Sequence, residues 1–229
     1  TATIETTDGD LSITGTAIAA STGSANTGIT NEGTLRTTGT GSINLNGISY
    51  SSGTYFNTGV GSSGTIAAQG SGNITITGTG STNSTGTDNH GIEMSGSITT
   101  NTGTIELTGT GGSGTDYNRG VNLSGTVSAG NSITITGNGA TDTTGTFNEG
   151  VLINYGDITS SAGTVTIAGT AGTGSGFGYG YGTRNAGVVV GLSGSVSSSG
   201  TGIEITGYGT TDPNASANNH GVDIQGTVA

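Results

Sequence analysis

Short stretches in which aliphatic and polar residues alternate recur along the whole chain. The clearest has the form aliphatic-x-aliphatic-x-Gly, where x is any residue. It occurs seven times, at Leu11/Ile13/Gly15, Ile43/Leu45/Gly47, Ile74/Ile76/Gly78, Ile105/Leu107/Gly109, Ile133/Ile135/Gly137, Val165/Ile167/Gly169 and Ile203/Ile205/Gly207. Alternation with period two and an excess of β-branched residues are typical of strands that bury one face.

Two further elements recur between these stretches in a fixed order. The first is Asn-x-Gly followed by Ile or Val, which begins at Asn26, Asn57, Asn89, Asn118, Asn148, Asn185 and Asn219. The second follows a short way along the chain and consists of Gly, a small or acidic residue and an aliphatic. Its members are Gly33-Thr34-Leu35, Gly64-Thr65-Ile66, Gly96-Ser97-Ile98, Gly125-Thr126-Val127, Gly156-Asp157-Ile158, Gly194-Ser195-Val196 and Gly226-Thr227-Val228.

Three short strands in each repeat of about 32 residues, with no helical periodicity between them, predict an all-β chain. The fold that suits this pattern is a right-handed parallel β-helix, or β-solenoid, of about seven coils. Each strand then pairs with its equivalents in the coils above and below, and the aliphatics form columns inside. One predicted column is Ile29, Val60, Ile92, Val121, Val151, Val188 and Val222. Another is Ile13, Leu45, Ile76, Leu107, Ile135, Ile167 and Ile205.

The low content of hydrophobic residues has a different explanation once the repeat is known. The 229 residues include 49 Gly and 47 Thr, and only 28% are hydrophobic, which by itself would favour disorder. The few aliphatics stand at the columns, so residues 1–229 are interpreted as one thin solenoid segment. Because its ends show no polar or helical cap, we expect it to be a fragment of a longer repeat protein.

Charge and residue types limit the partners and the chemistry. The chain has 14 acidic residues, three Arg, no Lys, no Cys and a net charge of −11. Without a basic patch, binding to nucleic acid is not expected. No apolar stretch approaches the roughly 18 residues of a membrane-spanning helix, so membrane insertion of this segment is not expected either.

The seven Asn residues of the Asn-x-Gly motifs would stack at one corner of the solenoid. Their side-chain amides would form a structural hydrogen-bond ladder along the axis. The alternative is a row of amides that binds a ligand. We attribute the following Gly to a sharp turn of the chain.

Repeat length varies in one connection, between the aliphatic-x-aliphatic-x-Gly element and the next Asn. This connection is shortest at 110–117 and longest at 170–184, and variable loops on one face are where solenoids usually place recognition. The longest connection contains Phe177, Tyr179 and Tyr181, which we take as possible contacts to a carbohydrate or a host or neighbour-cell protein. The alternative is that these rings fold back over the coil edge. The aromatics directly before several Asn positions, Phe56, Tyr117 and Phe147, are interpreted as corner packing rather than ligand contacts.

Residues suited to catalysis are scattered over several predicted columns. They are Glu93, Glu106, Glu149, Glu204, Asp116 and Asp157. Pectin-cleaving enzymes share the β-helix but need carboxylates or a basic residue gathered on one face, and the three Arg are dispersed. His90 and His220 are interpreted as solvated turn residues four coils apart. Asp8 and Asp10 form an isolated acidic pair. We therefore expect no enzyme activity, no metal and no cofactor.

An ice-binding surface is a further alternative, because flat Thr ladders on β-solenoids serve that function. Thr75/Thr77 and Thr134/Thr136 have the right spacing on one face, but Glu106 and Glu204 share their column and interrupt it.

The degenerate Gly-Thr-Ile, Ile-Thr-Ile-Thr-Gly and Asn-x-Gly-Val repeats resemble the shafts of large secreted bacterial adhesins. The family is the filamentous-haemagglutinin and autotransporter-passenger type. This resemblance implies a right-handed β-helix that is exported across the outer membrane. It also implies an extracellular role at the bacterial cell surface, as a stalk, filament or adhesin. Two functions follow as hypotheses: a non-catalytic structural shaft, whose partners are neighbouring coils or copies stacked end to end, and a binding module that uses residues 170–184.

Overall fold

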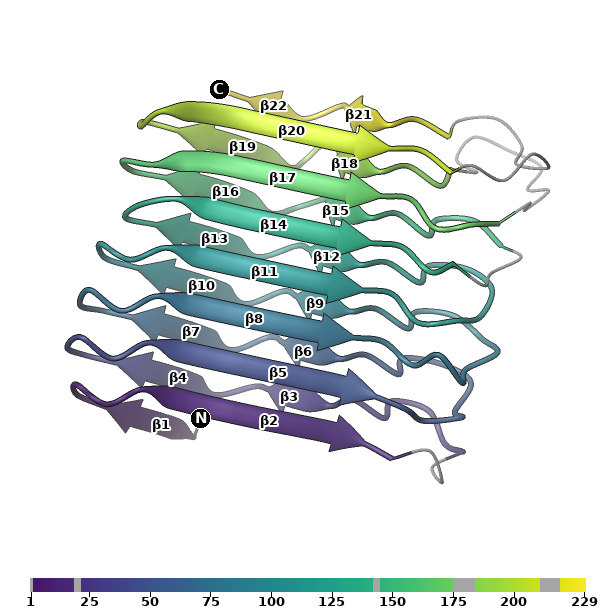
Figure 1. The fold of residues 1–229 in the computed structure, drawn as a ribbon, viewed down its shortest axis with the longest axis horizontal. Coiled ribbons are helices and arrows are strands. Elements are labelled where there is room, and N and C mark those ends of the chain that lie inside the picture. The colour runs from purple at the N-terminus through teal and green to yellow at the C-terminus, as the bar shows by residue number, and fades with distance from the viewer. Residues whose placement is uncertain (1, 19–21, 142–144, 175–183, 211–218) are drawn as a thin grey trace.

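The computed structural model describes residues 2–18, 22–141, 145–174, 184–210 and 219–229, and the chain winds through them as a right-handed parallel β-solenoid (Figure 1). We number the coils by the Asn that begins each one, from coil 1 at Asn26 to coil 7 at Asn219. The described residues contain 22 strands, all in parallel pairing, in three sheets. The predicted fold class is confirmed.

Successive strands go to sheet A, sheet B and sheet C in turn. Sheet A contains β1 (Thr3–Thr6), β4 (Thr34–Thr37), β7 (Thr65–Ala68), β10 (Ser97–Thr100), β13 (Thr126–Ala129), β16 (Asp157–Ser160), β19 (Ser195–Ser198) and β22 (Thr227–Val228). Sheet B contains β2 (Leu11–Ala17), β5 (Ile43–Ser49), β8 (Ile74–Thr79), β11 (Ile105–Thr110), β14 (Ile133–Asn138), β17 (Thr164–Thr170) and β20 (Gly202–Tyr208). Sheet C contains β3 (Ile29–Asn31), β6 (Val60–Ser62), β9 (Ile92–Met94), β12 (Val121–Leu123), β15 (Val151–Ile153), β18 (Val188–Val190) and β21 (Val222–Ile224).

The register between neighbouring strands places the predicted columns in line. In sheet C, Ile29 pairs with Val60 and Val60 with Ile92, and the same column continues to Val222. In sheet B, Ile13 pairs with Leu45, and that column continues to Ile205. Both columns are therefore confirmed as the sequence predicted them.

Each coil contributes about five aliphatic side chains to one continuous core. In coil 3 these are Ile92, Met94, Ile98, Ile105 and Leu107, none more than 1% exposed. Burying five such side chains stabilises a coil by about 10 kcal/mol. Ordering about 30 residues costs more than that, so a coil is stable only in contact with its neighbours.

The same columns are exposed in the first and last turns. Their exposed members are Ile4, Val222, Ile224 and Val228. None of the described residues forms a helix that could cross a membrane.

Two glycines in every coil bring the backbones of sheets B and C into contact. A Cβ at the Gly that follows the aliphatic pair of each sheet B strand would lie 1.8–2.2 Å from the carbonyl oxygen of an Asn-x-Gly glycine. The pairs are Gly15–Gly28, Gly47–Gly59, Gly78–Gly91, Gly109–Gly120, Gly137–Gly150, Gly169–Gly187 and Gly207–Gly221. This glycine contact closes the core on the side where sheet B leads into the variable connection.

The glycine contact gives a second reason for the Gly of Asn-x-Gly. The chain bends at each of these glycines, as the sequence predicts, but they are not among the residues with positive φ. The positive φ falls instead on the residue before each of the first five Asn, at Ala25, Phe56, Asp88, Tyr117 and Phe147, with φ between 57° and 61°. Gly is required after the Asn because any Cβ would strike the neighbouring backbone.

Candidate functional site

The seven Asn residues lie in one column at the corner between sheets B and C. Asn57 accepts a hydrogen bond from Asn26 through its Oδ1 (3.1 Å), and the Nδ2 of Asn57 donates to Asn89 Oδ1 (2.9 Å). From Asn57 onward, the backbone N–H of each Asn also donates to the side-chain oxygen of the next, at 2.8–3.2 Å, as far as Asn219. The amides are thus bonded to one another along the axis.

The ladder is buried, so losing one of its hydrogen bonds is costly to the stability of the fold. Asn57, Asn89, Asn118 and Asn148 are fully buried, and an unsatisfied buried amide costs about 1–3 kcal/mol. Their Nδ2 groups also donate hydrogen bonds to carbonyl oxygens of the variable connections. Asn57 donates to Gly53 O at 2.8 Å and Asn89 to Ser113 O at 3.1 Å. Asn118 Nδ2 has no partner among the described residues.

The residue between Asn and Gly forms a second column, and it changes character along the solenoid. From coil 1 to coil 7 its members are Thr27, Thr58, His90, Arg119, Glu149, Ala186 and His220. Those of coils 2 to 6 are buried, whereas His220 is exposed. This column, together with the centre of each sheet C strand, makes up the outer face of sheet C.

Arg119, Glu149 and Arg184 form a buried ion network across coils 4 and 5. Arg119 Nε donates to Glu149 Oε2 at 2.7 Å, and Arg184 Nε donates to Glu149 Oε1 at 3.2 Å. Arg184 also reaches Asp223 Oδ2 in coil 7 at 3.3 Å. Glu149 is 0% exposed, so its charge depends on these partners. The expectation of three dispersed Arg is therefore wrong, since two of them meet at one carboxylate.

Aromatic rings before the Asn column cover part of this network. Tyr117 and Phe147 stack one coil apart, with ring centroids 4.9 Å apart and planes 5° from parallel. The guanidinium carbon of Arg119 lies 5.1 Å from the Tyr117 ring centroid, within the range of a cation–π contact.

His90 is not the solvated turn residue that the sequence indicated. It is 1% exposed, its Nδ1 accepts the backbone N–H of Arg119 at 3.3 Å, and its Nε2 lies 3.8 Å from Asp88 Oδ1. Burial, followed by the positive charge of Arg119, holds the pKa of His90 well below its usual range. The imidazole is therefore neutral at neutral pH.

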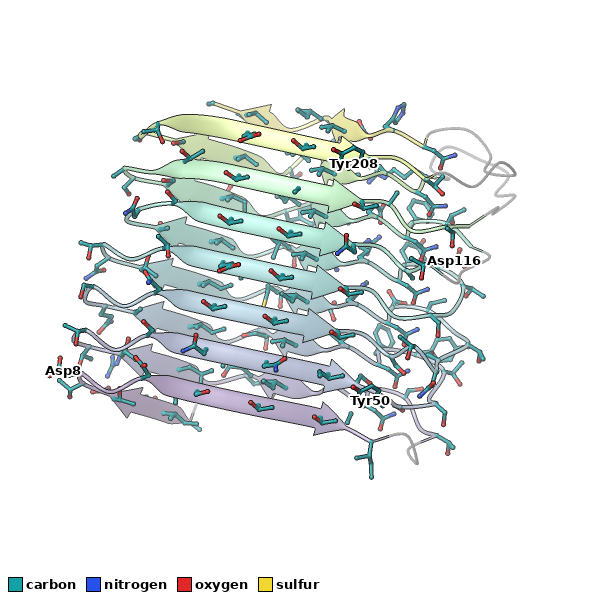
Figure 2. The ribbon with its side chains drawn as sticks, viewed as in Figure 1. Asp8, Tyr50, Asp116 and Tyr208 are labelled. Atoms are coloured by element: carbon teal, nitrogen blue, oxygen red, sulfur yellow. The ribbon has the colours of Figure 1, made fainter. Side chains whose placement is uncertain are left out.

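A second polar ladder runs along the turn between sheets A and B. Asp10 Oδ1 accepts the N–H of Ser42 at 2.8 Å, Ser42 Oγ accepts that of Asn73 at 3.1 Å, and Asn73 Oδ1 accepts that of Thr104 at 2.8 Å. Asp8 Oδ1 likewise accepts the N–H of Thr40 at 3.2 Å. Asp8 is labelled at the edge of the sheets in Figure 2. The acidic pair thus bonds to the following coil.

The remaining candidate residues lie apart from one another. Glu106 and Glu204 stand on the outer face of sheet B, Asp157 accepts the Oγ–H of Ser195 at 2.5 Å in sheet A, and Asp116 accepts the N–H of Thr146 at 2.7 Å. Among the described residues no three His, Cys, Asp or Glu side chains come together as metal ligands. Phe177, Tyr179 and Tyr181 lie outside the described residues.

The sequence did carry a weak signal for the buried network. All three charged residues lie next to or within an Asn-x-Gly motif, where coils 1 and 2 have only Ala, Thr and Phe. Comparison of the chain with protein-family models, with curated proteins and with solved structures finds no match.

Proposed function

We propose that this chain is a shaft segment of a large secreted bacterial adhesin or extracellular filament, and that its function is length and stiffness rather than catalysis. The observation that carries the proposal is the direction of the polar contacts. The Asn ladder, the turn ladder and the ion network all run from coil to coil along the axis. Side chains capable of chemistry, such as Glu149, are bonded to the coils beside them.

Contacts in this direction resist separation of the coils. Separating coil 4 from coil 5 would break the Arg119–Glu149 pair, the Asn118–Asn148 bond and the strand pairs β12–β15, β13–β16 and β14–β17 together. Cooperative loss of several bonds is what gives parallel stacks their mechanical strength. The exposed apolar columns of the first and last turns support the stacking of further coils or copies on them.

Surface labelling of the bacterium that makes the protein tests the proposal. An antibody raised against residues 1–229 is expected to label intact cells, and immunogold particles are expected along thin filaments in electron micrographs. Labelling only after cell lysis would contradict the proposed location, and compact particles in place of filaments would contradict the shaft.

Resistance to trypsin is a second expectation for an exposed shaft. Arg119 and Arg184 are held in buried ion pairs, and Arg36 lies within strand β4. The folded protein is therefore expected to survive a digestion that cleaves the urea-unfolded chain at all three arginines, as followed by mass spectrometry.

A further inference from the structure

The outer face of sheet C is hollowed in coils 1 to 3. The hollow has a volume of about 290 Å³, near the lower limit of about 300 Å³ for small-molecule sites. Its two long walls are the Ala25–Phe56 column and the Glu32–Ser63–Ser95 column. Its floor is made by Thr27, Thr58, Thr30, Gly61 and Glu93. A cavity of this size fits one small ring.

Gly61 opens the floor, and packing does not require it to be glycine. It is the centre of strand β6, in the column Thr30, Gly61, Glu93, Asn122, Leu152, Val189 and Asp223. A Cβ at Gly61 would meet only Thr27 Cγ2, at 3.7 Å. Most other glycines in the described residues would place a Cβ less than 3 Å from backbone or side-chain atoms. The missing side chain at Gly61 therefore makes space for something other than this chain.

Phe56 presents an uncovered ring at the wall of the hollow. It is 51% exposed, and its φ of 57° follows from its place before the Asn column. Two coils higher, Tyr117 and Phe147 cover each other's faces. Phe56 instead has Ala25 and Asp88 as its neighbours in the column, so no described aromatic side chain stacks on it. Of the three aromatics interpreted as corner packing, Tyr117 and Phe147 do pack on each other, whereas Phe56 keeps about half of its surface exposed.

Polar groups around the hollow match a ligand rich in hydroxyls. Thr27, Thr30, Ser63 and Ser95 supply hydroxyls, and Glu32 supplies an exposed carboxylate. The buried hydroxyl of Thr58, a floor residue, has no hydrogen-bond partner among the described residues.

We propose that this hollow is a carbohydrate site that takes one neutral pyranose unit, stacked on Phe56 and hydrogen-bonded by Glu32, Glu93 and the threonine and serine hydroxyls. A pyranose has an apolar face of C–H groups for the ring and hydroxyls for the polar groups. An anionic sugar is disfavoured by two carboxyls and a net charge of −11.

Glu93 lies partly buried at the floor of the hollow. Burial, and then the nearby charge of Asp88, raise the pKa of Glu93, while Arg119 acts in the opposite direction. The carboxyl oxygens of Glu93 can accept hydrogen bonds from sugar hydroxyls.

Nuclear magnetic resonance titration tests the site directly. The probes are the methyl glycosides of glucose, galactose, mannose and N-acetylglucosamine, with N-acetylneuraminic acid and a lysine-rich peptide as alternatives. At least one neutral glycoside is expected to shift the backbone amides of Gly61 and Ser63 with a Kd on the order of 1 mM. The absence of any such shift, or shifts caused only by the acid or by the peptide, would overturn the proposal.

Matched variants separate the site from the fold. Phe56→Ala is expected to weaken binding at least about tenfold, and Gly61→Val is expected to abolish it by filling the floor while the protein remains folded. Tyr208→Ala, an exposed ring on sheet B, and Asn122→Val, two coils higher in the Gly61 column, are expected to leave the Kd unchanged. If Gly61→Val bound the glycoside like the wild type, the site would lie elsewhere. The proposed stacking uses the first and last turns and not Phe56 or Gly61, so we expect filaments to form in these variants, and failure of the binding test would leave the shaft proposal unaffected.

Discussion

The outer faces of sheets B and C belong to the same stack of coils but differ in how far their side chains are exposed to solvent. On sheet B, shown in front in Figure 2, the outward residues of the strands stand in regular columns and remain at least partly exposed. On sheet C, several outward residues of the middle coils are buried: Arg119 and Glu149 form ion pairs, and Leu152, Ala186 and Val189 form a small apolar cluster. Alternation along a strand thus decides which side a residue faces, but contacts with side chains of neighbouring coils decide whether that side is buried.

The largest difference in stability between the two faces is expected when a buried carboxylate on sheet C and an exposed carboxylate on sheet B are each replaced. Glu149→Gln removes the charge that Arg119 and Arg184 share, and leaves guanidinium groups without their buried partner. A loss of about 3–5 kcal/mol in the free energy of unfolding is expected, measured by urea denaturation. Glu106→Gln on sheet B is expected to change it by less than about 0.5 kcal/mol. Equal effects of the two variants would show that the network carries no such energy.

A smaller but still large contrast is expected for the amides. Asn89→Ala removes the acceptor of the Asn57 N–H and of Asn57 Nδ2, both of which are buried. The free energy of unfolding is expected to fall by about 2–3 kcal/mol. Asn44→Ala, on the exposed face of sheet B, is the control and is expected to cost less than about 0.5 kcal/mol. A cost below about 1 kcal/mol for Asn89→Ala would mean that water replaces the ladder bonds without penalty.

The third contrast is in pH dependence, between two histidines of the same column. His90 is buried with a lowered pKa, so below about pH 6.5 the unfolded chain takes up a proton that the folded chain does not. The stability that neutral His90 contributes is therefore complete above that pH and is lost as the pH falls toward the folded-state pKa.

The expected slope is at most about 1.4 kcal/mol per pH unit. His90→Thr, which copies coil 2, is expected to remove this part of the slope in urea denaturations at pH 7, 6 and 5. His220→Thr changes the exposed histidine of the same column and is expected to keep the wild-type slope. Parallel stability curves for wild type and His90→Thr would contradict the assignment.

The smallest effect is expected on sheet B itself. Glu106→Thr combined with Glu204→Thr would make the outer column of sheet B threonine in every coil from 2 to 6, continuous with Thr75, Thr134 and Thr166. Both glutamates are exposed. The double change is therefore expected to alter the melting temperature by no more than a few degrees. A shift as large as that of Asn89→Ala would remove the distinction between the two faces.

The sequence predicted those parts of the molecule that repeat in every coil. Inward columns such as Ile29–Val222 follow from period two and a fixed repeat, and the Asn positions follow from a motif with little variation. Burial of His90 and Glu149 does not follow, because it depends on contacts that the repeat pattern does not specify, such as those of Glu149 with Arg119 and Arg184. Nor does the meeting of the two arginines at one carboxylate, because Glu149 lies 30 residues after Arg119 and 35 residues before Arg184 in the sequence.

The hollow on sheet C was missed for a related reason. Gly61 is one of 49 glycines, and nothing in the sequence distinguishes it from those that backbone contact requires. Gly61 and Gly59 differ only in the space around the position of a Cβ. At Gly61 that space is open, whereas a Cβ at Gly59 would lie within 3 Å of Thr79 N and two carbonyl oxygens.

The glycine contact between sheets B and C divides each coil into two compartments, with the core on one side and the variable connection on the other. Insertions and deletions in the connection are therefore screened from the core, which explains how connections as different in length as 110–117 and 170–184 occur in one unbroken stack. For evolution, this makes the corner a position where loops can be gained, lost or exchanged without resetting the register. For protein engineering, it marks the connections as sites for grafted peptides, displayed about 4.8 Å apart along the axis.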